Sequence, residues 1–224
     1  PRINLLHLSS AKAVEAALLM AKTFPHIDFR REDTIGHLIA DIHTASGIGG
    51  KVNPPLRPRE DVEALWGHLL AGELDWVVSD HACCRDEQKF GDDRDDVFLA
   101  KSGFGGAEYL LPALVSEGRK RGLGWDRIAA LTSWNPAQRY GLPTKGAIKE
   151  GHDADLCLVD PDRLWTVRAA DSLSAQEYTP FEGFELTGAV TDTFVRGMRV
   201  LTDGVITGEP RGRYLHRPTG PAGA

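Results

Sequence analysis

Short apolar runs in the first 80 residues alternate with segments in which apolar residues recur every three or four positions. The short runs predict strands, and the helically spaced segments predict helices between them. In chain order these are a strand at 3–8, a helix at 11–23, a strand at 27–31, a helix at 59–71 and a strand at 74–79. Such alternation is typical of parallel strands joined by crossover helices, in which ligands gather at the carboxyl ends of the strands.

The remaining segments of this part are predicted to be loops and helices. Residues 32–58 read as a loop with some helix, and His37, His43 and His68 are interpreted as surface or loop histidines rather than ligands. Residues 86–96 include six acidic side chains and predict a mobile surface loop, with a cover over a substrate as the alternative. Further helices are expected within 105–121 and 125–140.

The pattern changes near Gly141. From there the apolar runs are short and separated by Gly, Asp and Pro, which predicts strands and turns. The runs lie at 146–148, 154–159, 165–167, 189–196 and 199–207. We therefore expect an α/β part at 1–140, a small β-rich domain at 141–217, and a disordered Pro/Gly/Ala-rich tail at 218–224.

Composition narrows the classes of function. The 224 residues carry 26 basic and 32 acidic side chains, a net charge of −6 without a basic stripe, so nucleic acid and anionic membranes are poor partners. No apolar run approaches the roughly 20 residues that span a bilayer. Three cysteines cannot build a disulfide framework, which favours a reducing compartment, by default the cytoplasm. The adjacent Cys83 and Cys84 are interpreted as packing beside a pocket.

Two side chains at predicted strand ends could carry chemistry. His7 lies at the end of the first predicted strand and Asp80 follows the third, and imidazole and carboxylate are natural ligands of zinc. Two donors do not hold a catalytic zinc, which needs at least three. On spacing alone, a polar or structural role for His7 and a helix cap or loop hydrogen bond for Asp80 remain open.

Six ordered segments resemble one enzyme family, the cyclic amidohydrolases: dihydroorotase, allantoinase, hydantoinase and dihydropyrimidinase. The matches extend over nearly the whole chain, and they are far more specific for the superfamily than for a substrate. The segments are Leu6-His7-Leu8-Ser9-Ser10, Asn53-Pro54-Pro55-Leu56-Arg57, Val78-Ser79-Asp80-His81, Ser102-Gly103-Phe104-Gly105-Gly106-Ala107-Glu108, Asn135-Pro136-Ala137 and the stretch from Gly146 to Leu156.

The resemblance implies a (β/α)8 barrel with a binuclear metal site, usually zinc, and a small β-sandwich built from both ends of the chain. This chain would begin at the sixth barrel strand and contain strands 6–8. His7 matches a metal-ligating histidine, and Asp80 matches an aspartate that binds metal and acts as general base. The other metal ligands of the family have no counterpart here. The opening at Pro1, without an initiator methionine, also reads as though cut from something longer.

The implied reaction is the opening of a cyclic amide by a hydroxide that bridges two metal ions, with Asp80 transferring the proton to the departing ring nitrogen. In the resembled family, substrate contacts come from the neighbourhoods of Asn53 and Ser102. On spacing alone, the segment Asn53-Pro54-Pro55 is better explained as a rigid turn than as a substrate contact. His81 and Cys84 stand where the family also contacts substrate. A cysteine at position 84 is similar to allantoinases, whereas dihydroorotases have histidine there, so a ureide, hydantoin or lactam is as good a candidate as dihydroorotate.

Two classes of function remain open. The chain is either the C-terminal portion of a metal-dependent hydrolase or a non-catalytic scaffold related to it, and the presence of both His7 and Asp80 favours the enzyme. We expect the chain alone to lack hydrolase activity, because two donors cannot fix two metals. An incomplete barrel exposes apolar surface, so we also expect contact with the missing N-terminal portion and assembly into a homo-oligomer.

Overall fold

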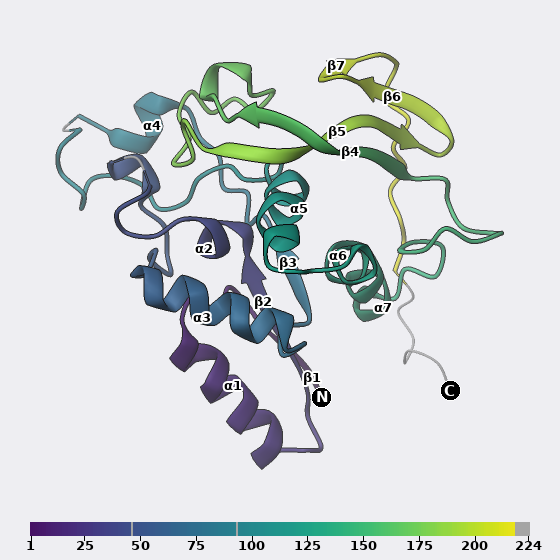
Figure 1. Ribbon diagram of the computed structural model, residues 1–224, viewed down its shortest axis with the longest axis horizontal. Coiled ribbons are helices and arrows are strands. Elements are labelled where there is room, and N and C mark those ends of the chain that lie inside the picture. Colours follow the sequence, from purple (N-terminus) through teal and green to yellow (C-terminus); the bar gives the residue numbers. More distant parts are fainter. Residues whose placement is uncertain (46, 93, 218–224) are drawn as a thin grey trace.

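The computed structural model describes residues 1–45, 47–92 and 94–217. Its first part contains a parallel sheet of three strands in the order β1 (Arg2–Leu5), β2 (Asp28–Thr34) and β3 (Trp76–Val78) (Figure 1). In register, Leu5 pairs with Arg31 and Thr34 pairs with Val78. All three predicted strands are confirmed, although β1 ends three residues earlier and β2 extends three residues further than the apolar runs.

Crossover helices connect these strands. The helix α1 (Ala11–Thr23) has the predicted bounds, and the side chain of its cap Ser10 accepts a hydrogen bond from the amide of Ala13. The helix α3 (Arg59–Leu70) packs against α1 and buries Leu65, Trp66 and Leu69. Figure 1 shows the arrowheads of β2 and β3 pointing toward the loops that lie under the second sheet.

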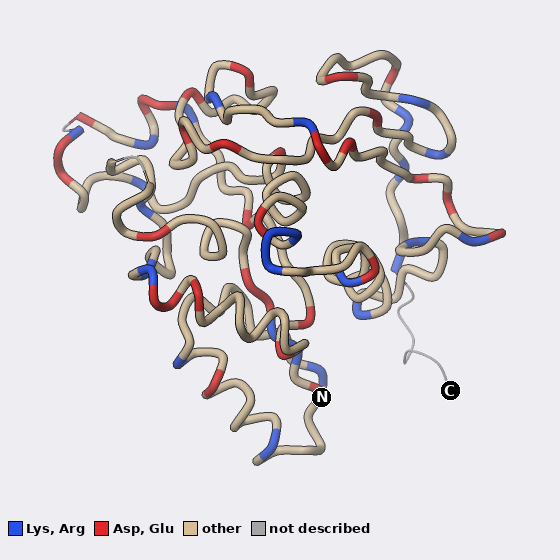
Figure 2. The backbone as a smooth tube through the Cα atoms, viewed as in Figure 1, with Lys and Arg blue, Asp and Glu red and all other residues tan. Residues whose placement is uncertain are grey.

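The segments between these elements hold short helices. They are α2 (Ile35–Ile39), the 3-10 helix η1 (Ile48–Gly50) and α4 (Asp86–Phe90). The expectation of a loop at 86–96 is therefore wrong for its first half, because Lys89 and Phe90 are buried and anchor the segment as a helical turn. Figure 2 shows acidic residues gathered on the loop that follows α4.

A second helical stretch precedes the β-rich part. It contains α5 (Leu110–Lys120), α6 (Trp125–Ala129), the π-helical segment η2 (Ala130–Trp134) and α7 (Asn135–Tyr140). Pro136 lacks the amide proton that an α-helical turn would use here, which fits the change of helical pitch just before it. The helix α7 ends at Gly141, whose φ of 66° is the left-handed conformation of a helix cap.

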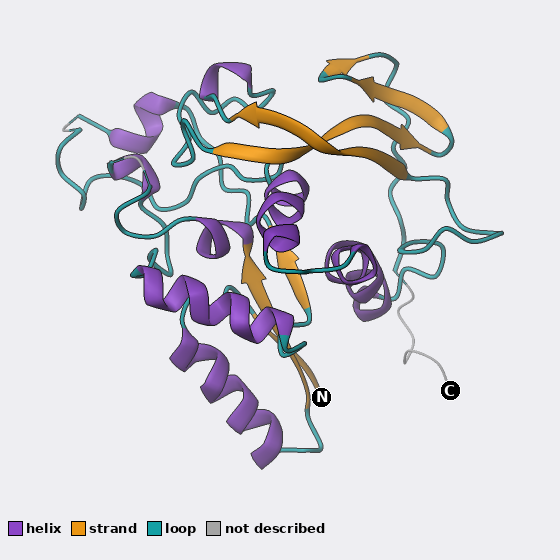
Figure 3. Ribbon diagram, in the orientation of Figure 1, coloured by secondary structure: helices purple, strands orange, loops and turns teal. Residues whose placement is uncertain are grey.

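The C-terminal part forms an antiparallel sheet of four strands (Figure 3). The strands are β4 (Leu156–Thr166), β5 (Glu185–Val195), β6 (Met198–Thr202) and β7 (Val205–Ile206), and the short helix η3 (Ala169–Asp171) follows β4. The runs at 154–159 and 165–167 belong largely to one strand whose register shifts after Asp160. The strand expected at 146–148 is wrong: these residues form turns and Ile148 is 90% exposed. The tail at 218–224 lies outside the described residues.

The two sheets are joined through α5. Its Leu114 and Val115 belong to the same hydrophobic cluster as Phe181 and Leu186 of the C-terminal part. The strand β5 approaches α5 closely at Gly188, where a Cβ atom would lie 2.7 Å from Cγ1 of Val115. A φ of +119° also restricts this position to glycine, so any side chain here would separate the helix from the sheet.

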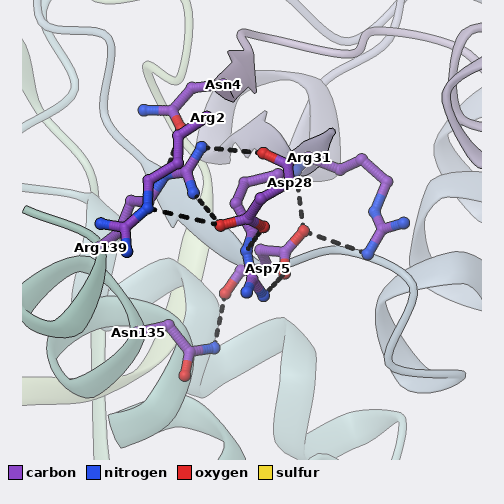
Figure 4. A network of polar contacts seen from close by, with 8 residues as sticks. Arg2, Asn4, Asp28, Arg31, Asp75, Asn135 and Arg139 are labelled. Carbon is purple, nitrogen blue, oxygen red and sulfur yellow. Dashed lines mark hydrogen bonds and ion pairs between the residues drawn. The ribbon is translucent and has the colours of Figure 1, made fainter. Parts of the chain in front are cut away.

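A network of ion pairs ties α7 to the amino ends of the parallel strands (Figure 4). Arg139, whose side chain is 7% exposed, donates to Asn4 Oδ1 at 2.6 Å and to both the carboxylate and the carbonyl of Asp28. Asp75 accepts from Arg30 and from the amide of Arg31. This network lies at the end of the sheet opposite His7 and Asp80, where it fixes the strands relative to one another.

None of the helices in the described part of the chain has the length and apolar character of a membrane-spanning segment.

Candidate active site

His7 and Asp80 follow the carboxyl ends of the two outer strands. His7 has a φ of 40° and Asp80 a φ of 47°. Both therefore have a positive φ, which costs a residue other than glycine about 1–3 kcal/mol; Arg196 and Asp203 share it in the turns on either side of β6. His7 is half-buried and Asp80 is exposed, so both side chains are open to ligands at the same end of the sheet.

His37 lies between these two residues, and the expectation that it is a surface or loop histidine is wrong. It follows the middle strand β2 within α2 and is only 3% exposed. Its Nε2 lies 3.1 Å from the carbonyl of Pro54 and its Nδ1 lies 2.7 Å from Thr34 Oγ1. Because a carbonyl only accepts, Nε2 carries the proton and the Thr34 hydroxyl donates to Nδ1 in the neutral imidazole.

The pKa of His37 depends on the groups around it. Burial lowers the pKa of His37, the hydrogen bond to the Pro54 carbonyl opposes this, and the nearby His7 and Arg57 lower it further whereas Asp80 raises it. His37 is therefore neutral at neutral pH and lies within electrostatic reach of both His7 and Asp80. The sheet order places these two residues, 73 positions apart in the sequence (80 minus 7), at the same end of one sheet.

Asn53 and Ser102 lie next to each other in the structure. Asn53 Nδ2 donates a hydrogen bond of 2.9 Å to Ser102 Oγ, and both residues are exposed. Behind them, the amide of Gly103 donates to the carbonyl of Lys51 at 2.9 Å. A φ of +100° and a Cβ position 2.7 Å from Cβ of Ala82 require glycine at 103. The loops that carry these two candidate substrate contacts are therefore paired through side chain and backbone.

His81 is turned toward the backbone that leads into α5. Its Nδ1 accepts from the amides of Gly106 at 3.1 Å and Ala107 at 3.2 Å. The neighbouring amide of Gly105 donates to Gln176 Oε1, which comes from the segment between β4 and β5. The β-rich part of the chain therefore contributes directly to the loops that follow β3.

Cys84 also contacts the segment between β4 and β5. Its Sγ lies 3.7 Å from the hydroxyl of Tyr178, and Cys83, Cys84 and Cys157 are all free thiols. Tyr178 is held from its other side by Phe90, with ring centroids 5.5 Å apart. Cys84 is half-buried in this contact, whereas Cys83 is exposed, so the expectation that both cysteines pack is wrong for Cys83.

The side chains of His7 and Asp80 are suited to form part of a metal site. Imidazole and carboxylate, the side-chain groups of His7 and Asp80, are ligands that zinc prefers. Within the described ranges, no group of three or more His, Cys, Asp or Glu side chains could hold a metal ion. The described residues therefore do not form a complete metal site.

Comparison with known proteins places the chain in a family. The model of the amidohydrolase family matches residues 7–200, so the chain belongs to the amidohydrolase family. An allantoinase of Rubrobacter xylanophilus is 39% identical over 216 residues, which cover 95% of this chain and 46% of the relative. A dihydroorotase of Halobacterium salinarum is 38% identical, with 81% of this chain and 41% of the relative covered.

Solved structures agree with this assignment. A D-hydantoinase matches with a TM-score of 0.89 and 29% identity, covering 97% of this chain and 48% of the other. A D-hydantoinase (dihydropyrimidinase) from Thermus sp. matches with a TM-score of 0.83 and 31% identity, covering 92% and 46%. The resemblance to the cyclic amidohydrolases and the α/β fold are confirmed. The chain spans about half the length of the curated relatives that it matches.

Sequence reasoning missed the residues that support the site from other segments. These are His37, Arg57, Lys89, Gln176 and Tyr178. The one signal for His37 was Thr34, a possible helix cap three residues after the strand predicted at 27–31. Gln176 and Tyr178 gave no such signal, since they lie in an irregular segment more than 70 residues along the chain from their partners.

Proposed function

We propose that this chain is the C-terminal portion of a metal-dependent hydrolase that opens a cyclic amide. The proposal depends on one observation above all. His7 and Asp80 follow the carboxyl ends of β1 and β3, on either side of the buried His37, so an imidazole and a carboxylate stand at the same end of one sheet. These are side chains that a zinc site uses.

The architecture that we propose follows the relatives. Residues 1–140 supply strands 6–8 of a (β/α)8 barrel, and residues 141–217 supply most of a β-sandwich domain. The open edge of β1 supports this, because Ile3 is 37% and Leu6 is 51% exposed there. An N-terminal portion of the same protein would cover this edge and supply the remaining metal ligands. We also propose a homo-oligomer, since exposed apolar residues such as Phe98 extend beyond that edge.

The two candidate ligands have different roles in the proposed reaction. A pair of zinc ions, when bound, would supply an attacking water that is acidic near neutral pH. His7 would hold part of the metal site through a ring nitrogen of its imidazole. Asp80 is exposed and carboxylate-bearing, so it can take the proton of the attacking water and return it to the ring nitrogen as the amide bond breaks.

Asn53, Ser102, His81 and Cys84 are proposed to contact the substrate. Asn53 and Ser102 present an amide and a hydroxyl at the same exposed position, which suits the alternating N–H and C=O groups of a cyclic ureide or imide. Cys84 offers no charge to a substrate carboxylate. This favours an uncharged ring such as allantoin or a hydantoin over dihydroorotate, in line with the allantoinase relatives.

Turnover by the complete protein tests the proposal. The full open reading frame, including the portion upstream of Pro1, is expressed with zinc and assayed on allantoin, hydantoin and dihydroorotate side by side. We expect metal-dependent hydrolysis of at least one ring and none by residues 1–224 alone. A folded, zinc-loaded complete protein that hydrolyses none of them would contradict the proposal and favour the non-catalytic scaffold.

A further inference from the structure

Lys89 is a fully buried cation outside the residues assigned so far. It lies on α4, and its side chain is among the largest that are completely enclosed. Its ammonium group donates to the carbonyl of Lys51 at 2.9 Å and to the carbonyl of Gly103 at 2.7 Å. A buried lysine is costly unless its charge is well solvated by such partners, so its location calls for a reason.

The two carbonyls belong to the loops that carry the candidate substrate contacts. Lys51 precedes Asn53 by two residues, and Gly103 directly follows Ser102. The carbonyl of Lys51 also accepts from the amide of Gly103 at 2.9 Å, and the amide of Lys101 donates to the carbonyl of Lys89 at 2.8 Å. Lys89 thus lies at the junction of three backbone segments, directly behind the hydrogen bond between Asn53 and Ser102.

The surroundings of Lys89 stabilise its charge only in part. The ammonium lies 5.6 Å from the ring centre of Tyr178, and Cys84 and Lys51 are the ionisable neighbours that act on it. Burial lowers the pKa of Lys89 to about 8, Cys84 raises it and Lys51 lowers it. Among the described residues, the Lys89 side chain is therefore held by carbonyl groups and an aromatic face rather than by a carboxylate, which is the arrangement of a backbone clamp.

We propose that Lys89 is a positioning residue for substrate binding, whose ammonium group holds the backbones that present Asn53 and Ser102 in one geometry. This inference rests on the function proposed above. Without the clamp, the two loops would sample several arrangements, and only the fraction with the binding geometry would take substrate. The apparent substrate affinity would be the intrinsic affinity multiplied by that fraction, whereas the chemistry at Asp80 would be unaffected once substrate is bound.

The test compares Lys89→Met with two other variants in the complete, zinc-loaded protein. Methionine keeps the length of the side chain and removes the donor. Lys89→Gln keeps a neutral donor, and Lys12→Met removes an exposed lysine on α1 as the matched control. Two quantities are measured for each: KM and kcat on the ring that the unmodified protein hydrolyses, and hydrogen exchange of the peptides at 51–53 and 101–104.

We expect Lys89→Met to raise KM by about tenfold with kcat within about threefold. Exchange at 101–104 should accelerate, bound zinc should be unchanged, Lys89→Gln should be intermediate, and Lys12→Met should match the unmodified protein. If Lys89→Met does not fold, Lys89→Gln decides by the same measurements. A KM within twofold together with unchanged exchange would overturn the inference, and so would equal losses in kcat and zinc.

The exchange measurement separates this inference from the proposed function. If the complete protein hydrolyses no ring, the function fails, yet accelerated exchange at 101–104 in Lys89→Met would still support the clamp. If the protein is active and exchange does not change, the clamp fails and the function stands.

Discussion

Asn53 and Ser102, 49 positions apart in the sequence, are joined by a hydrogen bond of 2.9 Å from Nδ2 to Oγ. Two exposed polar side chains gain little stability from such a bond, since water can replace either partner. The pairing is instead maintained from behind, by the backbone bond from Gly103 to Lys51 and by Lys89. The hydrogen bond therefore fixes the two polar groups relative to each other, as recognition of a small ring requires.

Removal of either partner should weaken substrate binding. We predict that Asn53→Ala and Ser102→Ala each raise KM by about tenfold, and that the double variant is less impaired than the product of the two, because the groups act together. Steady-state kinetics on the complete protein measure this. Asn4→Ala, at the opposite end of the sheet, is the control and should lower stability with KM unchanged. Independent effects of the two substitutions would contradict the coupling.

His7 should act through metal occupancy. We predict that His7→Asn lowers bound zinc in the complete protein, because the amide is a weaker zinc ligand than imidazole, and that added zinc restores part of the activity. Metal content by mass spectrometry, with a zinc titration of turnover, checks this. His43→Asn, at an exposed position, is the control. Full zinc content in His7→Asn would show that His7 is not a ligand.

The network at the amino ends of the strands should govern stability rather than activity. Arg139→Met removes three hydrogen bonds and leaves the Asp28 carboxylate with its other neighbours Arg2 and Arg30. We predict a loss of about 2 kcal/mol in the free energy of unfolding, since Asp28 remains partly solvated. Urea unfolding measures this loss, and the exposed Arg211→Met, which lies outside the network, serves as control. A loss in kcat with unchanged stability would contradict this assignment.

Lys89 should leave a signature in the pH dependence of stability. Its pKa is about 8 in the folded protein against 10.5 for an unperturbed lysine. Between these values the unfolded chain binds the extra proton, so Lys89 makes the free energy of unfolding rise with pH, by at most about 1.4 kcal/mol per pH unit. Below pH 8 both states are protonated and the slope vanishes.

Urea titrations of the unmodified protein and Lys89→Met between pH 7 and about 10.5 test this slope. The free energy of unfolding of the unmodified protein minus that of Lys89→Met should increase with pH. Taking this difference cancels the contribution of groups such as Tyr178 that both proteins share. Lys12→Met should give a difference that does not change with pH. A flat difference for Lys89→Met would show that the buried ammonium keeps its ordinary pKa.

Local pattern was enough to predict the framework of the chain. The helix at 11–23 was predicted with its bounds because Ser10 caps it and Pro25 closes it. The strand expected at 146–148 failed because Gly146, with a φ of +85°, packs against Ser133 and Trp134 as a turn. Apolar composition does not distinguish an exposed turn from a strand when a distant helix decides the geometry.

The candidate site was predictable only where it depends on strand ends and motifs. His7 and Asp80 could be singled out because they follow predicted parallel strands. The burial of His37 and Lys89 could not, because both are polar residues whose partners, Pro54 and Gly103, are backbone carbonyls. A carbonyl is present at every position, so no sequence pattern marks the one that a buried cation or imidazole will contact.

The most direct test of the account is the turnover of Asp80→Asn in the complete protein. Asparagine keeps the volume of the side chain and removes the basic oxygen. On the ring that the unmodified protein hydrolyses, the account predicts that kcat falls by about 10²–10⁴-fold, the scale of losing a general base, while bound zinc falls only in part. Turnover of Asp80→Asn near that of the unmodified protein would contradict the role of Asp80 and the proposed active site with it.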